Sequence, residues 1–414
     1  MLTYVLNSNG QPLMPTSRSG KVRRLLKDKK AKVIKRCPFT IQLLYKTGNT
    51  VQEVNLGVDA GSKHIGISAT TKDQVLYEAD VELRNDIKEL ISTRRESRHT
   101  RRGRKTRYRA PRFNNRRICD EWLSPSVRQK IDCHLKVIEN VHKILPVAKI
   151  MIETASFDLQ KIKNPEISGT DYQQGDKFNF WNIREYVLFR DNHECQCCHG
   201  KSKDLILNIH HIESRKVGGN APNNLITLCK TCHTNYHKGK VKMPKTIHRG
   251  MKFNDTAFMG LMRWQVYNHL KEYYTDVSFA YGYKTKNTRI EKSLPKEHFI
   301  DARCISGNPE AISDGVVYYQ KKIRCHNRQI YKFKVNKGGT RKKNQAPYLV
   351  NGFRLYDKVI YNSHECFITG RRSSGQFMLK NLDWSKVSDS VSFKKLSPLE
   401  TSKHYLTERR FVFF

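Results

Sequence analysis

The chain has 414 residues, with 77 lysine and arginine residues against 38 acidic residues, and its formal net charge is +39. An excess of this size repels itself unless a polyanion supplies counter-charge, so nucleic acid is the first candidate partner. No run of about 18 apolar residues occurs and the start lacks a secretory pattern, which predicts a soluble cytoplasmic protein without membrane spans. At about 150 residues per domain, the length predicts two to three domains.

The first strongly periodic segment is 54–81, where short apolar and polar runs alternate between turn signals. This pattern predicts three antiparallel strands. Apolar residues at helical spacing from Val127 to Leu145 predict a helix, and the apolar stretch after Pro146 predicts a buried strand. Downstream we expect helices at 180–191, 257–274 and 296–305, a short strand at 277–283, and a mostly β C-terminal hundred residues.

Two Cys-x2-Cys pairs, Cys195 with Cys198 and Cys229 with Cys232, lie close together among the eleven cysteines. Each pair can bind one side of a tetrahedral zinc ion. Disulfides and unpaired core cysteines are the alternatives, but two such pairs in one short module rarely coincide by chance. We therefore predict a structural Zn²⁺ site, in which Cys197 could substitute as a ligand.

The segment ILNIHHIESRKVGGNAPNNLITLCKTCHTNYH resembles the HNH nuclease motif. It predicts a strand that ends at His210 and His211, then Asn224 before a second strand. His233 and His237 follow one turn apart on a helix, which completes a ββα-metal hairpin. The resemblance implies that His211 is the general base and that Asn224 braces the loop between the strands. It also implies one Mg²⁺ bound by His210 and His233, with His237 as a weaker third contact.

Four further residues suggest a second acidic site split across the chain. Asp59 and Glu153 each end an apolar strand, which alone is often only a turn position, while His298 and Asp301 share one helix face. An RNase H-like fold, with the three strands of 54–81 antiparallel and the next strand parallel to the first, would bring the carboxylates together. Three such carboxylates hold two Mg²⁺ ions about 4 Å apart. His298 would polarise or deprotonate the attacking water, an arrangement that resembles RuvC-type nucleases.

Three blocks hold most of the excess positive charge. The block 94–117 has eleven arginines and one acidic residue, and as a helix it would span about 36 Å with arginine on every face. No packed core tolerates such a helix, so we predict an RNA-contacting bridge helix, broken near Gly103 or Pro111. A solvated, disordered arm is the alternative. The arginines that we expect to bind nucleic acid here are Arg94, Arg95, Arg98, Arg101, Arg102, Arg104 and Arg107.

The other two basic blocks are 18–36 and 321–343. The first mixes apolar residues with Arg23 and Arg24, which predicts a folded RNA-binding face. The second alternates aromatic residues with lysines at strand spacing, which is typical of a β surface that meets nucleic acid.

The order of these motifs resembles that of RNA-guided CRISPR effectors, although the chain is too short for their large recognition lobe. The Pro-Leu-Met-Pro signature at 12–15 is similar to that of the IscB family of transposon-encoded (OMEGA) RNA-guided nucleases, and the resemblance covers essentially the whole chain. It implies a multidomain α/β and α+β protein with an RNase H-like (RuvC) core. That core is split by the bridge helix and the HNH insertion. The implied domains are 1–53 (Pro-Leu-Met-Pro, RNA-binding), 54–82 (RuvC-I), 83–120 (bridge helix), 121–178 (RuvC-II), 179–250 (HNH with zinc knuckles), 251–314 (RuvC-III) and 315–414 (basic, β-rich).

The resemblance implies a Mg²⁺-dependent, RNA-guided endonuclease for double-stranded DNA. A noncoding guide RNA would pair with one strand, the HNH site would cut that strand, and the RuvC site would cut the displaced one. By analogy Arg371 and Arg372 would read a short motif beside the target. We expect a monomeric ribonucleoprotein in a prokaryotic cytoplasm, nucleoid-associated when bound to DNA.

Two features depart from the pattern. His210 stands where the large effectors have Asp, and Cys197 stands where an aromatic residue is common. Two other functions remain open: a stand-alone HNH endonuclease that reads DNA by protein contacts, and a non-catalytic RNA-binding protein.

Overall fold

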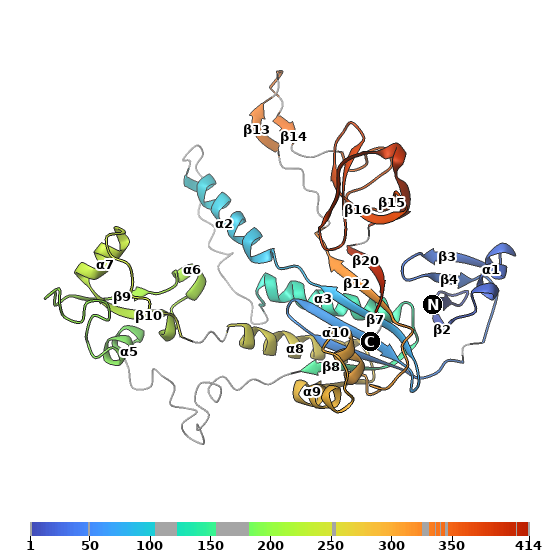
Figure 1. Cartoon of the computed structure of the whole chain (residues 1–414), viewed down its shortest axis with the longest axis horizontal. Coiled ribbons are helices and arrows are strands. Elements are labelled where there is room, and N and C mark those ends of the chain that lie inside the picture. The colour runs from blue at the N-terminus through green and yellow to red at the C-terminus, as the bar shows by residue number, and fades with distance from the viewer. Residues whose placement is uncertain are drawn as a thin grey trace. The chain divides into compact units, whose positions relative to one another are not determined.

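The computed structural model describes residues 2–48, 50–103, 122–154, 182–250, 254–324, 331–335, 337–339, 341–343, 347–402 and 404–412. The chain divides into two compact units (Figure 1). We call Met1–Ala155 with Met259–Phe414 the core unit, and Ser156–Phe258 the inserted unit. Among the described residues, no helix is both long and apolar enough to cross a bilayer.

A seven-stranded sheet forms the centre of the core unit, in the order β11-β8-β5-β6-β7-β12-β20. Strands β5, β6 and β7 form an antiparallel meander and β8 runs parallel to β5, so the strand arrangement predicted from the sequence is confirmed. The strand bounds are β5 Val54–Ala60, β6 His64–Thr70, β7 Val75–Glu82, β8 Val147–Thr154, β11 Val277–Tyr281, β12 Val316–Lys322 and β20 Tyr405–Phe411.

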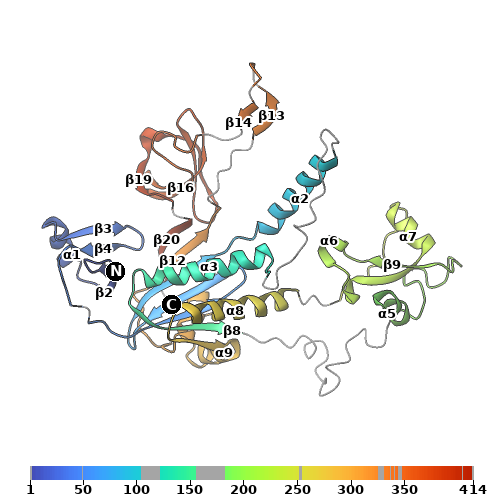
Figure 2. The same cartoon turned by 180° about the vertical axis from the view of Figure 1, so that it is seen from behind.

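Five helices accompany this sheet in the described residues. They are α2 Ile87–Gly103, α3 Pro125–His142, α8 Asn254–Tyr273, α9 Gly282–Glu291 and α10 His298–Ile305. In both views α8 and α9 lie near β8, at the side of the sheet where β11 is the edge strand (Figures 1 and 2). Helix α2 begins upstream of the predicted arginine block, and the predicted break at Pro111 lies outside the described residues. Helix α9 was not predicted, because its sequence GYKTKNTRIE has no apolar periodicity.

Helix α10 lies directly on two glycines of the sheet. A Cβ atom at Gly57 would lie 1.9 Å from the Ala302 carbonyl oxygen, and one at Gly66 would lie 1.9 Å from the His298 carbonyl oxygen. Because a Cβ atom needs more than 3 Å, only glycine allows the helix to approach this closely. Gly66 is also the cross-strand partner of Asp59, so the close approach places the start of α10 over that carboxylate.

Gly66→Ala is therefore expected to push α10 off the sheet and destabilise the core unit by about 1–3 kcal/mol, the usual cost of overpacking. Denaturant unfolding with a global probe would measure the change. Gly20→Ala is the matched control, because nothing lies within 4 Å of the Cβ position at Gly20. Equal stability of the two variants would show that α10 is not held by contact at Gly66.

A buried ion pair fixes the other end of α10. Arg303 donates from Nε to Glu78 Oε1 at 2.8 Å and from Nη2 to Oε2 at 2.9 Å. Ser68 and Ser313 also donate to the Glu78 carboxylate. Breaking one partner of such a pair leaves an uncompensated buried charge, so the pair holds the helix in one register over β7.

Three smaller sheets complete the described part of the core unit, and one of them is the antiparallel pair β13-β14. The N-terminal sheet has the order β2-β1-β4-β3, and its edge strand β2 contains the Pro-Leu-Met-Pro signature, as expected for prolines that cannot donate to a ladder. A C-terminal antiparallel sheet has the order β18-β17-β16-β15-β19, which confirms the β-rich C-terminus. The bounds are β1 Thr3–Leu6, β2 Pro12–Thr16, α1 Ser19–Lys27, β3 Ala31–Lys35, β4 Thr40–Leu43, β13 Tyr331–Val335, β14 Arg341–Lys343, β15 Lys358–Tyr361, β16 His364–Arg371, β17 Gln376–Lys380, β18 Lys386–Ser392, η4 Phe393–Lys395 and β19 Ser397–Glu400.

The inserted unit is built around an antiparallel pair of strands followed by a helix. Strand β9 pairs with β10 in register from His211–Leu225 to Leu207–Cys229, and α7 follows directly. The predicted ββα hairpin is thus present. Its elements are α5 Ile183–Arg190, β9 Leu207–His211, α6 Arg215–Gly218, η3 Pro222–Asn224, β10 Leu225–Cys229 and α7 Lys230–His237.

Candidate active sites and nucleic-acid interface

Three histidines of the inserted unit come together where β9 faces α7. The ligand nitrogens of His210, His233 and His237 all lie within 4.8 Å of one another. His210 is 5% exposed, and its Nε2 has no hydrogen-bond partner among the described residues. Burial and the neighbouring histidines lower the pKa of His210 to about 4, which keeps the ring neutral and its lone pair free. A buried, neutral nitrogen without a partner fits a divalent metal ligand.

His211, the next residue on β9, is held by a contact that the sequence did not reveal. Its Nε2 lies 3.0 Å from Asn220 Oδ1. An amide oxygen only accepts, so Nε2 carries the proton and Nδ1 keeps the lone pair that a general base needs. Asn220 stands among three asparagines in the loop, and no sequence signal separates it from the others.

Asn224 is fully buried and holds the loop between β9 and β10. Its side chain accepts from the Glu213 amide at 2.9 Å and donates to the carbonyls of Glu213 and Gly219, each at 3.0 Å. A Cβ atom at Gly218 would lie 2.2 Å from the Asn224 side chain, so the loop wraps tightly around the amide. The structure therefore places Asn224 where it could brace the loop between the two strands.

Four thiols form the second cluster. The sulfur atoms of Cys195, Cys198, Cys229 and Cys232 all lie within 4.8 Å of one another, which suits tetrahedral zinc. Cys197 is not in this group and packs on the adjacent small apolar core. The residues present thus fit a site with four cysteine ligands that could hold zinc.

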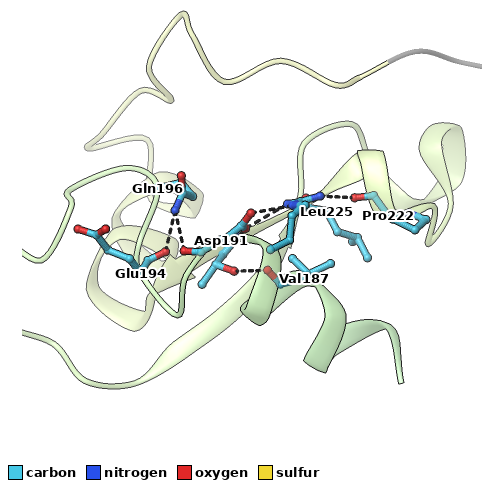
Figure 3. Close-up of polar contacts among 8 residues, drawn as sticks. Val187, Asp191, Glu194, Gln196, Pro222 and Leu225 are labelled. Carbon is cyan, nitrogen blue, oxygen red and sulfur yellow. Dashed lines mark hydrogen bonds and ion pairs between the residues drawn. The ribbon is translucent and has the colours of Figure 1, made fainter. Parts of the chain in front are cut away.

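A polar network joins α5 to the hairpin (Figure 3). Arg190 donates to the carbonyls of Pro222 and Leu225, at 2.9 and 2.8 Å, which lie on either side of Asn224. Asp191 accepts from the Thr227 amide at 2.8 Å, and its own carbonyl accepts from Gln196. The network connects the loop that holds Asn224 to the turn that starts the cysteine knuckle.

The four residues of the predicted acidic site meet in the core unit. Asp59 and Glu153 are the penultimate residues of the parallel strands β5 and β8, and α10 contributes His298 and Asp301. His298 Nδ1 lies 2.7 Å from Asp59 Oδ2, and this hydrogen bond raises the pKa of His298. The His298 ring also stacks on His64, with ring centroids 5.2 Å apart.

Each of the other two carboxylates has an arginine partner that was not predicted. Arg263 Nη1 lies 2.8 Å from Glu153 Oε1, and Arg289 Nε lies 2.9 Å from Asp301 Oδ1. Arginine is too common in this chain for the sequence to single these two out. Among the described residues, the histidine and cysteine clusters are grouped closely enough to share one metal ion, and the three carboxylates do not form such a group.

The electrostatics of this site nevertheless favour added positive charge. Burial raises the pKa of Glu153, and the charges of Asp59 and Asp301 raise it further despite the opposing effect of Arg263. Burial and Asp59 likewise raise the pKa of Asp301. Carboxylates whose negative charges repel one another are stabilised by a hard divalent cation such as Mg²⁺, so this group is suited to bind one.

The predicted nucleic-acid arginines lie mostly on exposed surface. Arg94, Arg95, Arg98 and Arg102 are exposed on α2, and Arg23 and Arg24 are exposed on α1. The side chain of Arg101 and the residues Arg104 and Arg107 lie outside the described residues. Arg372 is exposed, whereas Arg371 is half-buried and donates to the Tyr348 carbonyl.

Comparison with known proteins identifies two domains. Residues 3–175 match the RRXRR protein family, and residues 195–239 match the HNH endonuclease family. Over 60 residues, the chain is 38% identical to Anaredoxin from Nostoc sp.. The matched region makes up 14% of this chain and 74% of Anaredoxin. A segment of the chain therefore belongs to the same family as Anaredoxin. The two domain matches fit an IscB-like RNA-guided nuclease.

Among solved structures the chain is similar to Cas9 of Streptococcus thermophilus. The complex with the GGAA PAM gives a TM-score of 0.36 at 13% identity, and the complex with the AGAA PAM gives 0.34 at 13%. Each match covers 54% of this chain and 32% of the other, so the chain spans about a third of the length of those proteins.

Proposed function

We propose that this chain, which carries RRXRR and HNH domains and fits an IscB-like RNA-guided nuclease, cuts double-stranded DNA at sites chosen by a bound noncoding RNA. One observation carries the proposal: a ββα hairpin gathers three histidines around the unpartnered nitrogen of His210, beside an oriented His211. In this proposal the inserted unit cuts the guide-paired strand and the acidic site of the core unit cuts the displaced strand.

In the inserted unit, His211 would take a proton from the attacking water through Nδ1, while Asn220 holds the Nε2 proton. His210 and His233 would hold one Mg²⁺, with His237 as the weaker third contact. Bound there, the cation would stabilise charge on the scissile phosphate. Asn224 and the network around Arg190 keep the strand loop, and with it His211, in place.

In the core unit, Asp59, Glu153 and Asp301 would hold two Mg²⁺ ions, which activate water and stabilise the leaving oxygen in sites of this kind. His298, oriented by its hydrogen bond to Asp59, would polarise or deprotonate the water. Arg263 and Arg289 supply counter-charge to the other two carboxylates and orient them. We further propose that the sheet and α10 form an RNase H-like (RuvC) core.

The arginines of α1 and α2 would bind guide RNA by phosphate contacts, which are independent of sequence. Arg371 and Arg372 would read the target-adjacent motif, and the particle would be a monomeric ribonucleoprotein. The domain bounds that we propose are the seven ranges given above, with the HNH domain at 179–250.

The test is to purify the protein with the noncoding RNA encoded beside its gene, sequence the bound RNA, and supply targets in Mg²⁺. We expect cleavage to follow a changed guide sequence. Cleavage of one fixed sequence under every guide would instead identify a stand-alone HNH endonuclease. Absence of cleavage under every guide would leave a non-catalytic RNA-binding protein.

Asn220→Ala is expected to slow cutting of the guide-paired strand about 10- to 100-fold, the usual cost of losing a group that orients a catalytic side chain. Asn220→Asp keeps an acceptor for the Nε2 proton and should restore most of the rate. Single-turnover rates with each strand labelled would measure both. An unchanged rate in Asn220→Ala would exclude this residue as the partner that orients His211.

A further inference from the structure

A row of aromatic rings crosses from α8 over the edge strand β11 to α9. Trp264 and Tyr267 of α8 contact Phe279 edge-on, with ring centroids 5.5 and 5.4 Å away. Phe279 contacts Tyr281 at 5.4 Å, and Tyr281 stacks on Tyr283 of α9 at 6.1 Å with an interplanar angle of 14°. We call these five residues the aromatic ladder.

The ladder is anchored at one end and open at the other. Tyr267 is 9% exposed, whereas Phe279 is 38%, Tyr281 37% and Tyr283 61% exposed. A row that served only to pack the sheet edge would bury its rings rather than leave three of the five exposed. The outer three rings contact one another and the inner rings, so they are ordered before any ligand binds and present ring faces and edges at little entropic cost.

The open end of the ladder reaches the acidic site. Strand β11 runs parallel to β8, and Ala280 is in register with Glu153, so the exposed tyrosines stand at the strand ends where the carboxylates lie. Between the two tyrosines, a Cβ atom at Gly282 would lie 2.9 Å from Glu153 Oε1. Phe279 and Tyr281 alternate with Ala280 and so face the opposite side of the sheet from Glu153. The ladder thus lies at the sheet edge beside Glu153: two of its rings face the opposite side of the sheet, and Gly282, between the exposed tyrosines, lies against the carboxylate.

Positive charge accompanies the open end. Lys284 and Lys286 follow Tyr283 on α9 and are exposed. At the anchored end, Lys271 Nζ lies 5.3 Å from the centre of the Tyr267 ring. Rings with adjacent lysines suit a chain that has flat bases and phosphates, and single strands bind in this way with little sequence preference. A duplex offers no free base face to stack on these rings.

We propose that the aromatic ladder is a stacking platform for unpaired DNA, and that it guides the displaced strand into the acidic site. This inference rests on the proposed function and adds a substrate-binding surface to it. Tyr281 and Tyr283 stack on bases next to the cut, and Lys284 and Lys286 contact the phosphates. Because every base has a stacking face, the platform works for any guide.

The test uses the full-length protein with its co-purified RNA and a target that carries 2-aminopurine at successive positions of the displaced strand. In an Asp59→Ala background, which keeps the strand whole, 2-aminopurine near the cut should be quenched by stacking. The double variant Tyr281→Ala/Tyr283→Ala should lose the quenching. In the background with Asp59 intact, it should slow cutting of the displaced strand about tenfold or more, by the cost of lost base stacking.

Three comparisons make the result interpretable. Tyr281→Phe/Tyr283→Phe keeps the rings and should retain both signals, and Tyr273→Ala, an exposed tyrosine of α8 outside the ladder, should match the unmodified protein. Cutting of the guide-paired strand in the same reactions shows that each variant folds and binds its guide. The inference would be overturned if the double alanine variant kept both the quenching and the rate of displaced-strand cutting. It would also be overturned if that variant lost only RNA binding. If Asp59→Ala itself leaves displaced-strand cutting intact, the proposed function fails instead.

Discussion

Asp59→Ala is expected to abolish cutting of the displaced strand while the guide-paired strand is still cut. Asp59 is 7% exposed, accepts from His298, and lies near two other carboxylates, so its loss removes both a cation ligand and the group that orients His298. Losing several kcal/mol of transition-state stabilisation slows the step about 10²- to 10³-fold or more. A supercoiled plasmid target should therefore be nicked rather than linearised.

His211→Ala is the reciprocal variant and should slow cutting of the guide-paired strand by about 10²- to 10⁴-fold, the usual contribution of a general base. Duplexes labelled on either strand would assign each nick. If Asp59→Ala slowed both strands equally, the two sites would not be independent. If it slowed neither, the acidic residues would be structural, and a single HNH site would account for the cutting.

Cys229→Ser is expected to unfold the hairpin of the inserted unit and leave the core unit folded. Cys229 is 1% exposed at the junction of β10 and α7, and it accepts from the Cys232 amide at 3.4 Å. Three of the four clustered thiols, those of Cys195, Cys229 and Cys232, are buried members of the small apolar core at this point. Structural zinc sites contribute about 10 kcal/mol or more of folding free energy, far more than such a core can replace.

The variant should lose its bound zinc, become protease-sensitive within 182–250, and stop cutting the guide-paired strand. Cys197→Ser is the matched control, because Cys197 lies outside the four-thiol cluster. It should retain one zinc per chain and normal protease resistance. Full zinc content in Cys229→Ser would show that another residue completes the site.

The ββα hairpin and the cysteine pairs of the inserted unit could be predicted from sequence, because their signals are local. Both cysteine pairs, His210, His211, Asn224 and the α7 histidines lie within one short stretch, and their spacing sets the strand, loop and helix that carry them. Short-range order of this kind needs no knowledge of distant segments. What the pattern could not show was the partner of His211, since Asn220 is recognisable only once the loop has folded back.

The acidic site was less accessible from sequence, because its members are separated by up to 242 positions, from Asp59 to Asp301. The strand-end carboxylates and the His-x2-Asp spacing predicted which residues would meet. The structure adds how they are held: two glycines that let α10 touch the sheet, the Glu78–Arg303 pair beneath it, and Arg263 and Arg289 as counter-charges. None of these has a distinctive sequence pattern.

The +39 net charge and the clustered arginines by themselves predicted a polyanionic partner, and the motif spacings predicted which side chains would form the candidate sites. Only the tertiary structure decided the surroundings of those side chains. Helix α9 lacks periodicity, and the aromatic ladder comes from three elements, α8, β11 and α9, whose rings contact one another only in the folded chain. Residue type and local spacing are written in the chain, whereas contacts between distant segments exist only after packing has chosen one arrangement among many.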